Sequence, residues 1–381
     1  MLIGLNMLPV LQENGGTWNY VANLIQGLAS WDKENTYYAF VNSESKELVP
    51  IQGNFKVCLA RINARSRPLR VFYEHLWLIS QANKLNLDCI HWLGNTIAIT
   101  NRIPSLVTIY DILPFSQLTS ASILKRTYLK LMIQHASRIA TIILPMSNAT
   151  SQALQQQVGV SSANITVIPM PLLPTSKRAD MDAIARLREH YGLPDMFWLY
   201  VAHTYPHKNH VRLLEAYAKL RRSGQSLWPL VLRGDPRKAE YEISEAIQKL
   251  GVEDFVIRLP RLEEWEMSIL YSAASALIFP SQYEGGGLPV VEAMACGCPV
   301  VASNLDSIME YCGDAALYFN PNELMSIYYA MVKIQSEPGL RQQLTLRGAK
   351  QTLKFHQKEI VSRLIAEYAK AAQASSKKSL S

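Results

Sequence analysis

Two long stretches of this 381-residue sequence, positions 48–73 and 112–179, contain no acidic residue. Residues 1–175 hold 13 Lys and Arg against 8 Asp and Glu, so most of the net charge of +7 lies in the first half. This basic half suits an anionic partner, either a lipid surface or a diphosphate-linked acceptor, and a solvated helical face is the alternative of equal weight. Aromatic residues do not interleave with the basic ones in a recognition motif, which argues against nucleic acid. The basic residues concerned are Arg61, Arg65, Arg67, Arg70, Lys125, Arg126, Lys130 and Arg138.

Long apolar runs and paired cysteines are missing as well. No window of eighteen apolar residues occurs, and the start MLIGLNMLPV lacks a basic region, so it predicts a buried strand rather than a signal peptide. The five cysteines show no CxxC spacing, which is typical of buried free thiols in a reducing compartment. We therefore expect a cytoplasmic protein without a zinc site, whose basic half could contact the inner face of a membrane peripherally.

The length exceeds the size at which single cores stop growing, so two domains are expected. Short apolar runs alternate with helical patterns throughout, which predicts parallel sheets wrapped by helices and an α/β fold class. In the first half we predict strands at 2–6, 36–41, 56–59, 88–92, 105–110, 140–144 and 165–168, and helices at 18–29, 70–85, 123–136 and 148–158.

Three prolines within six residues, Pro169, Pro171 and Pro174, indicate a linker, after which the scheme repeats. Beyond Pro321 the chain is predicted to be helical to about Lys370, and the tail from Ser375 is predicted to be disordered. The expected domains are therefore 1–174, 175–355 and a C-terminal helix in 356–381 that packs back on the first domain. In the second half we predict strands at 197–202, 229–233, 255–259, 276–279, 299–302 and 316–319, and helices at 211–221, 239–250, 263–273 and 289–295.

The segment from Ser281 to Ser303 carries the strongest chemical signal. It follows a predicted strand and opens a helix at Pro289, and Gly285, Gly286 and Gly287 lie between the two. Glycine amides in front of the positive end of a helix form an anion site. A glycine triple by itself would be only a tight turn, but two glutamates eight positions apart, Glu284 and Glu292, bracket it.

Each of these glutamates has a predicted task. Glu292 lies about one turn into the helix, and a carboxylate near a helix N-terminus tends to stay ionised. An ionised carboxylate can only accept hydrogen bonds, which suits a vicinal diol such as a ribose. Glu284, nearer the glycines, would face whatever is attached to the phosphate.

Two basic residues follow strands at the same predicted sheet edge. Lys208 lies between the strand at 197–202 and the helix at 211–221, where its charge could neutralise a leaving diphosphate. Arg233 ends the next strand and could add a second positive charge, although a structural salt bridge is an equal alternative.

The segment Glu284–Glu292 resembles the E-x7-E signature of retaining glycosyltransferases of family 4, including bacterial hexosyl- and mannosyltransferases of polysaccharide assembly. Further similarity lies in Asn14-Gly-Gly16, in Tyr200-Val-Ala-His-Thr-Tyr-Pro-His-Lys-Asn209 and in Gly313-Asp-Ala-Ala316. The resemblance implies the GT-B fold, in which two Rossmann-like doubly wound domains face an interdomain cleft.

The resemblance also implies roles for individual residues. Lys208 would bind the diphosphate, Glu284 the donor sugar and Glu292 the donor ribose. The donor would be a nucleotide-diphosphate sugar, the acceptor a glycan or lipid-linked molecule, and the transfer would retain configuration without a metal ion. Further donor-binding residues would be Gly15, Gly16, Arg233, Gly285, Gly286, Gly287 and Leu288.

The sequence departs from the family pattern at two positions. Relatives commonly carry His-Asp where this chain has Tyr110-Asp111, and tyrosine cannot act as a base near neutral pH. Tyr110 is therefore expected to serve catalysis as a hydrogen-bond donor to the sugar. Relatives often place an arginine where this chain has His203, and Arg233 or Arg261 could replace that charge.

Two other functions remain open at this point. One is a different enzyme of the same fold, such as a nucleotide-sugar epimerase. The other is a non-catalytic subunit that binds sugar nucleotides, which the departures at Tyr110 and His203 make credible. HExxH, nucleophile-elbow and Walker motifs do not occur, so we expect no metal and no hydrolase chemistry.

Overall fold

The computed structural model describes residues 1–224 and 228–378 and divides them into two compact units. Unit 1 comprises residues 1–117, 121–171 and 355–381, and unit 2 comprises residues 118–120 and 172–354. The division therefore falls after Pro171, three residues before the predicted end of the first domain at Pro174. The C-terminal helix belongs to unit 1.

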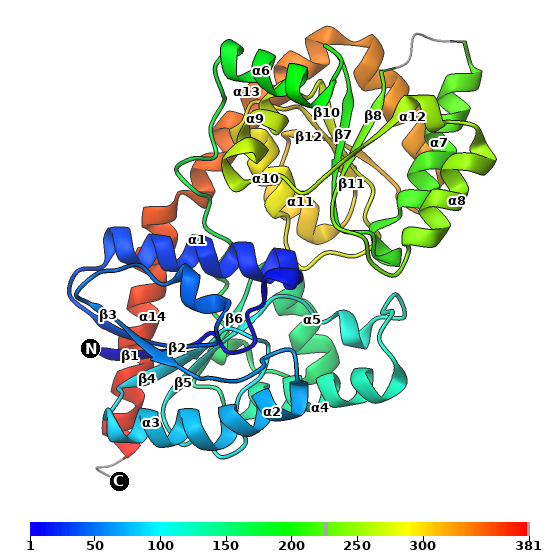
Figure 1. Cartoon of the computed structure of the whole chain (residues 1–381). Coiled ribbons are helices and arrows are strands. Elements are labelled where there is room, and N and C mark those ends of the chain that lie inside the picture. The colour runs from blue at the N-terminus through cyan, green and yellow to red at the C-terminus, as the bar shows by residue number, and fades with distance from the viewer. Residues whose placement is uncertain (225–227, 379–381) are drawn as a thin grey trace. The chain divides into compact units, whose positions relative to one another are not determined.

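Unit 1 is a six-stranded parallel sheet with the strand order β3-β2-β1-β4-β5-β6 (Figure 1). The strands β1, β4, β5 and β6 are almost wholly buried, because helices cover both faces of such a sheet, whereas the edge strand β3 is largely exposed. Their bounds are β1 Leu2–Asn6, β2 Thr36–Val41, β3 Phe55–Leu59, β4 Cys89–Trp92, β5 Ser105–Ile109 and β6 Ile142–Pro145. The helices are α1 Gly15–Trp31, α2 Arg67–Phe72, the π-helix η3 Tyr73–Leu78, α3 Ile79–Lys84, α4 Ile123–Ile139, α5 Asn148–Val158 and α14 Gln357–Lys378, with 3₁₀ turns η1 Gln12–Asn14, η2 Ser45–Leu48, η4 Leu113–Phe115 and η5 Ser162–Asn164.

Three predictions for this unit are corrected. The strand expected at 165–168 is only an isolated parallel bridge between Ile165 and Ile143. The helix expected at 70–85 is a continuous run of α2, η3 and α3 that begins at Arg67 and contains one π segment. The predicted disordered tail also differs, because α14 continues to Lys378, and residues 379–381 lie outside the described part of the chain.

Buried polar contacts attach α14 to unit 1. The Tyr368 hydroxyl lies 2.8 Å from Nδ1 of His91 on β4, and Nε2 of His91 lies 2.7 Å from the Thr108 hydroxyl on β5. Burial lowers the pKa of His91 to about 3, so this ring is neutral at pH 7. His91 is therefore a structural histidine inside the unit.

Unit 2 is a second six-stranded parallel sheet, with the order β12-β11-β10-β7-β8-β9. Read from β7, this is the same doubly wound order as in unit 1, and the strand order reverses between β7 and β10. The strands are β7 Trp198–Val201, β8 Leu230–Arg233, β9 Val256–Leu259, β10 Ala276–Phe279, β11 Val300–Ser303 and β12 Ala316–Phe319. The helices are α6 Met181–Tyr191, α7 His210–Arg222, α8 Glu240–Leu250, α9 Glu264–Ala273, α10 Leu288–Ala295, α11 Asp306–Cys312, α12 Leu324–Ser336 and α13 Pro338–Gln351, with 3₁₀ turns η6 Pro206–Lys208, η7 Glu253–Phe255 and η8 Thr352–Phe355.

Two helices of unit 2, α6 and α11, were absent from the sequence prediction. Helix α6 has clear ends, since the Asp180 side chain accepts a hydrogen bond from the Ala183 amide at 2.7 Å and Gly192 ends it at a φ of 62°. The prolines nearby had suggested a linker, and α6 lies directly after it. In the described part of the chain, no helix is long and apolar enough to span a membrane.

Candidate active site

The loops after β7 and β10 meet at the point where the strand order of unit 2 reverses. Ligands bind at the carboxyl ends of strands at such a switch point. The first loop contains η6 and Lys208, and the second runs from Pro280 to Gly287 and leads into α10. The amide of Gln282 donates to the carbonyl of His207 at 2.8 Å, so the two loops are joined directly.

The first loop is held in place on three sides. The Tyr200 hydroxyl donates to the Lys208 carbonyl at 2.5 Å. Asn209 adopts a left-handed conformation with a φ of 62°, and its side-chain amide donates to the carbonyls of Pro280 and Pro321 at 3.0 and 2.9 Å. The backbone that carries Lys208 is therefore fixed before any ligand arrives.

Lys208 and Glu284 form an ion pair across the two loops. Lys208 Nζ lies 2.7 Å from Glu284 Oε1, and the two side chains are 19% and 13% exposed. The Ser307 hydroxyl donates to the Glu284 carbonyl at 2.7 Å and anchors this part of the glycine loop. The structure thus brings together two predicted site residues that lie 76 positions apart in the chain.

The glycine loop leads directly into α10, where Gly287 is the N-cap residue and Leu288 is the first, buried, helical residue. A Cβ atom at Gly287 would lie 2.8 Å from a methyl group of Val290 and 3.3 Å from Ile308, so glycine is required for this close approach. The predicted strand–glycine–helix arrangement is present, with Gly285 buried and Gly286 half-buried.

Glu292 lies one turn into α10, and its Oε2 accepts a hydrogen bond from the Tyr271 hydroxyl at 3.0 Å. Burial, reinforced by the nearby Glu264 carboxylate, raises the pKa of Glu292 to about 7, although the Tyr271 hydrogen bond and the Arg233 charge oppose this shift. The expectation that Glu292 stays fully ionised is therefore wrong for the unliganded protein. The cost of burial exceeds the favourable field of the helix end.

Arg233 ends β8 and its charge acts on this carboxylate; the side chain is half-buried, and its buried Nε has no hydrogen-bond acceptor among the described residues. Arg261, the other candidate, is exposed in the loop after β9 and makes no hydrogen bond or ion pair with a described residue. Of the two, Arg233 is the one whose charge acts on Glu292 and on His203.

His203 follows β7 and accepts a hydrogen bond at Nδ1 from the Asp235 amide at 3.0 Å. Burial, reinforced by the charges of Arg237, Arg233 and Lys208, lowers the pKa of His203 to about 4, although the Asp235 carboxylate opposes this shift. His203 is therefore neutral at pH 7 and supplies no positive charge. Burial likewise lowers the pKa of His207 to about 4 and that of His210 to about 3.

Gly234 fixes the neighbouring backbone, although no feature of the sequence singled it out. A Cβ atom there would lie 1.9 Å from the Ala202 carbonyl oxygen, a distance that only glycine allows. Tyr271 and Ser307 were also missed, because each acts through a tertiary contact with a glutamate. The role of Asn209 could have been predicted from the sequence, since asparagine tolerates the left-handed conformation in front of a helix.

The predicted site residues of unit 1 lie at the carboxyl ends of its strands. Gly15 and Gly16 begin α1, and a Cβ atom at Gly16 would meet nothing within 4 Å. Tyr110 follows β5, and its hydroxyl donates to the Leu93 carbonyl at 3.0 Å while its ring edge packs against Tyr20 at 5.1 Å. The only hydroxyl hydrogen of Tyr110 is therefore engaged within unit 1.

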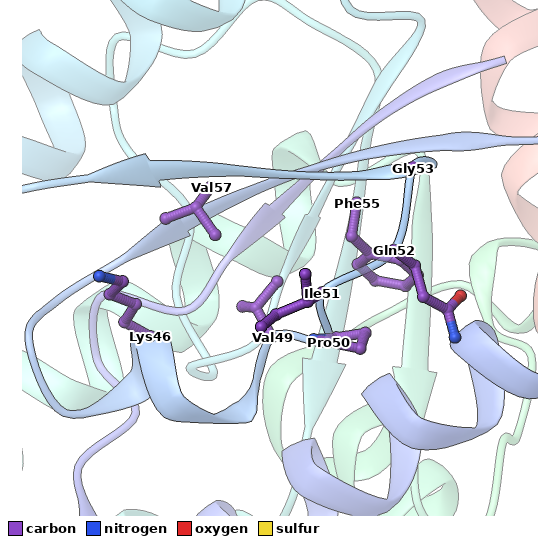
Figure 2. A pocket seen from close by; sticks show the side chains of 8 residues that line it. All are labelled: Lys46, Val49, Pro50, Ile51, Gln52, Gly53, Phe55 and Val57. Atoms are coloured by element: carbon purple, nitrogen blue, oxygen red, sulfur yellow. The ribbon is translucent and has the colours of Figure 1, made fainter.

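A separate pocket of about 480 Å³ lies beside the outermost strand of unit 1, β3 (Figure 2). Its lining is mainly apolar, with Lys46 at one end and Gln52 at the other, so polar groups do not converge in it. In the described residues, no group of three or more His, Cys, Asp or Glu side chains could hold a metal ion.

Residues 14–172 match the family model described as Glycosyltransferase Family 4, and residues 186–351 match the model described as Glycosyl transferases group 1. The chain belongs to glycosyltransferase family 4. The second match contains Lys208, Glu284 and Glu292, which places the paired loops and α10 in the part of the chain that the family shares.

Curated relatives of this family 4 chain include mannosyltransferases. O-antigen chain mannosyltransferase B of Escherichia coli is 32% identical over 170 residues, which is 45% of each chain. O-antigen chain mannosyltransferase RfbU of Salmonella typhimurium is 25% identical over 280 residues, covering 72% of this chain and 73% of that one. The chain spans less than half the length of the first curated relatives that it matches.

Solved structures with similar architecture are glycosyltransferases of the GT-B fold. Sucrose-phosphate synthase from Thermosynechococcus elongatus superposes with a TM-score of 0.82 at 19% identity, covering 98% of this chain and all of that one. HepE from Anabaena in complex with UDP-glucose gives a TM-score of 0.78 at 18% identity over 97% of this chain and 100% of that one. These similarities confirm the predicted GT-B fold class.

Proposed function

We propose that this chain is a hexosyltransferase that takes its sugar from a nucleoside-diphosphate donor. The observation that carries the proposal is the ion pair between Lys208 and Glu284, which joins the two loops at the switch point of unit 2. A cation beside a helix N-terminus and a glycine loop suits a diphosphate, and a carboxylate next to it suits sugar hydroxyl groups.

In this proposal, donor binding exchanges the partners of the ion pair. The diphosphate takes Lys208 together with the amides of Gly285, Gly286 and Gly287, and Arg233 contributes further positive charge. Glu284, released from Lys208, accepts hydrogen bonds from the hydroxyl groups of the donor sugar. Before the donor binds, the ion pair between Lys208 and Glu284 thus keeps both side chains oriented. It also prevents either side chain from being an unpaired, partly buried charge.

Glu292 is assigned to the ribose. Its carboxylate lies one turn behind the glycine loop and accepts from Tyr271 alone among the described residues, so the remaining oxygen lone pairs can accept from two ribose hydroxyls. Gly15 and Gly16 are proposed to admit the donor phosphate or the acceptor to the site without steric hindrance from side chains. Leu288, the buried first residue of α10, is proposed to hold the glycine loop in position.

We further propose that the transfer retains the anomeric configuration and needs no metal ion. The bond between the anomeric carbon and the diphosphate oxygen breaks, the acceptor oxygen bonds to the same face of that carbon, and the acceptor proton passes to the diphosphate. Lys208, Arg233 and the glycine amides neutralise the charge that develops on the leaving group. Proton NMR of the product, which reports the anomeric configuration, tests retention, and activity in the presence of a chelator tests metal independence.

The relatives favour mannose as the transferred sugar. Two of them are named O-antigen chain mannosyltransferases, which also supports a role in polysaccharide assembly and a glycan or lipid-linked acceptor. The donor can be identified with a panel of radiolabelled nucleotide sugars that includes GDP-mannose and UDP-glucose. The protein is expected to hydrolyse its true donor slowly when no acceptor is present. Epimerised product would instead indicate an epimerase, and binding without turnover would indicate a non-catalytic subunit.

We also propose a cytoplasmic location with peripheral contact to an anionic membrane through the basic unit 1. Binding to vesicles that contain phosphatidylglycerol is then expected to weaken as salt is added, because exposed charges are screened. Replacing Arg65, Arg67, Lys125 and Arg126 by glutamine is expected to weaken it further. Vesicle binding that ignores both salt and these four changes would contradict the membrane assignment.

A further inference from the structure

One buried hydroxyl group of unit 2 donates to the carboxyl group that is assigned to the ribose. The Tyr271 hydroxyl lies 3.0 Å from Glu292 Oε2, and no other described side chain donates to that carboxyl group. The side chain of Tyr271 is 1% exposed, whereas Glu292 keeps partial access to solvent. A ligand can therefore reach Glu292 but not Tyr271, so Tyr271 can act on a ligand only through the glutamate.

One face of α9 is directed at this carboxyl group. Helix α9 packs against α10, which carries Glu292. Glu264 and Tyr271 are seven positions apart on α9, and residues at this spacing lie on the same side of a helix. The charge of Glu264 also acts on Glu292, as expected if that side of α9 is turned toward it.

The position of α9 is fixed by hydrogen bonds near both of its ends. At its start, the Glu263 amide donates to Glu266 Oε2 at 2.8 Å, and the hydroxyl of Tyr191 on α6 donates to Glu266 Oε1 at 2.8 Å. Near its end, the Ser272 hydroxyl accepts from the Ala179 amide at 3.0 Å. The Tyr271 ring is therefore carried by a helix that is held in place on the protein side.

The Tyr271 hydroxyl is a donor over the whole range of physiological pH. Burial raises the pKa of Tyr271 well above its usual value, and the charge of Glu292 acts in the same direction. A protonated phenol has a single hydrogen, and here Glu292 accepts it. A hydrogen bond donated to a carboxylate favours the ionised form of that carboxylate.

The other groups that act on Glu292 do so through charge. Glu264 on α9 disfavours ionisation, whereas Arg233 on β8 favours it, and α11 and α13, which also pack against α10, add no charge to these among the described residues. Cys296 lies one turn further along α10, and burial raises the pKa of its thiol to about 12, so it is neutral. Tyr271 is thus the one group that both orients this carboxyl group and favours its ionisation.

A carboxylate that accepts from two vicinal hydroxyls must present both oxygens in a defined plane. Binding groups keep such a geometry when packing and hydrogen bonds from a second layer of residues hold their side chains. We propose that Tyr271 is a positioning residue of the donor site, whose hydroxyl fixes the plane of the Glu292 carboxylate and favours the ionised form that accepts from the ribose. The inference rests on the proposed function, because it takes Glu292 as the ribose-binding residue.

The effect of Tyr271 on Glu292 can be measured without a ligand. Carbon-13 NMR of the full chain, labelled at the glutamate carboxyl groups, follows ionisation, and the Glu292 signal is the one lost in Glu292→Gln. Its titration midpoint is expected near pH 7 in the wild type. In Tyr271→Phe it is expected to rise to about pH 8, because a hydrogen bond to an ionised group changes the proton affinity about tenfold. A midpoint that does not rise would overturn the inference.

The effect on the ligand is measured by calorimetry with GDP and UDP at pH 6, 7 and 8. The ligand titrates too, but its own ionisation cancels in the ratio of wild-type to Tyr271→Phe affinity. With midpoints of about pH 7 and pH 8, this ratio is expected to fall from about ninefold at pH 6 to about twofold at pH 8. A structural loss alone would lower the affinity equally at each pH, so a constant ratio would contradict the positioning role.

Tyr217→Phe is the matched control. Tyr217 is a fully buried tyrosine on α7 in the same unit, and its hydroxyl bonds to the carbonyls of Trp228 and Phe255 at 3.1 Å each. Its loss should leave both the Glu292 midpoint and the affinity ratio unchanged. A change as large as that in Tyr271→Phe would show a general effect of removing a buried hydroxyl and would overturn the inference.

Glu292→Gln separates the inference from the proposed function. A loss of GDP or UDP affinity in Glu292→Gln at pH 8, together with a constant ratio for Tyr271→Phe, would remove the positioning role and leave the proposed function standing. Wild-type affinity in Glu292→Gln would instead remove the ribose assignment itself, and the role of Tyr271 in donor binding with it.

Discussion

Glu292 makes the affinity for the nucleotide depend on pH in a way that one substitution should abolish. Its pKa is about 7 in the unliganded protein because the carboxyl group is buried, and only the ionised form can accept hydrogen bonds from both ribose hydroxyls. With this pKa, about one tenth of the molecules are ionised at pH 6 and about nine tenths at pH 8. The apparent affinity scales with that competent fraction.

Nucleoside-diphosphate affinity of the wild type is therefore expected to rise about tenfold from pH 6 to pH 8 through Glu292 alone. The terminal phosphate of the ligand titrates in the same range, so the comparison must be made with Glu292→Gln. Calorimetric titrations at pH 6, 7 and 8 give the ratio of the two affinities at each pH. A wild-type-to-Glu292→Gln ratio that stays constant over this range would refute the reasoning.

Ionisation of Glu292 also affects stability, but in the opposite direction: rising pH strengthens nucleotide binding and lowers the free energy of unfolding. The folded state holds the Glu292 proton more tightly than the unfolded chain does, so the free energy of unfolding falls as pH rises between 4.5 and about 7. A pKa raised from 4.5 to about 7 corresponds to about 3 kcal/mol, at 1.36 kcal/mol for each tenfold change in proton affinity. Glu292→Gln should lack this loss, which urea unfolding of both proteins at pH 5 and pH 8 would measure.

Four further predictions follow from particular contacts. Lys208→Ala is expected to lower turnover by roughly 10²–10³, the usual loss for one preorganised group at a developing anion, and rates within a few-fold of wild type would remove it from the site. Glu284→Gln should weaken binding of the intact sugar nucleotide but spare the nucleoside diphosphate, and calorimetry with both ligands would detect equal losses if the assignment is wrong. Tyr110→Phe should lower the free energy of unfolding by about 1 kcal/mol with turnover retained, because its hydroxyl bonds to a backbone carbonyl; a selective loss of turnover would instead support a contact with the sugar. Gly234→Ala should destabilise the protein by about 1–3 kcal/mol or more, whereas Gly53→Ala, at a position with open space, should not.

Much of the fold could be predicted from local sequence patterns. The strands at 2–6 and 36–41 have the predicted bounds, because buried parallel strands are nearly continuous apolar runs. The segment at 165–168 has the same character but makes only one bridge, since pairing depends on the neighbouring strand and not on the segment itself. Helix α6 was missed where prolines suggested a linker.

The candidate site was likewise predicted from the sequence only in part. The spacing of Glu284 and Glu292 around three glycines, at a junction between strand and helix, was sufficient to indicate an anion site and the family. Charge alone was a poor guide to ionisation, because the pKa of Glu292 depends on burial and on Tyr271 and Arg233, which come from other elements.

The sequence by itself therefore determined the alternation of strands and helices, the position of the glycine loop and the excess of positive charge in the first half. These properties depend on residues that are close together in the chain. Only the tertiary structure decided that Lys208 pairs with Glu284 and that burial raises the pKa of Glu292 to about 7. Such outcomes depend on distance and desolvation between distant segments, which local sequence does not encode.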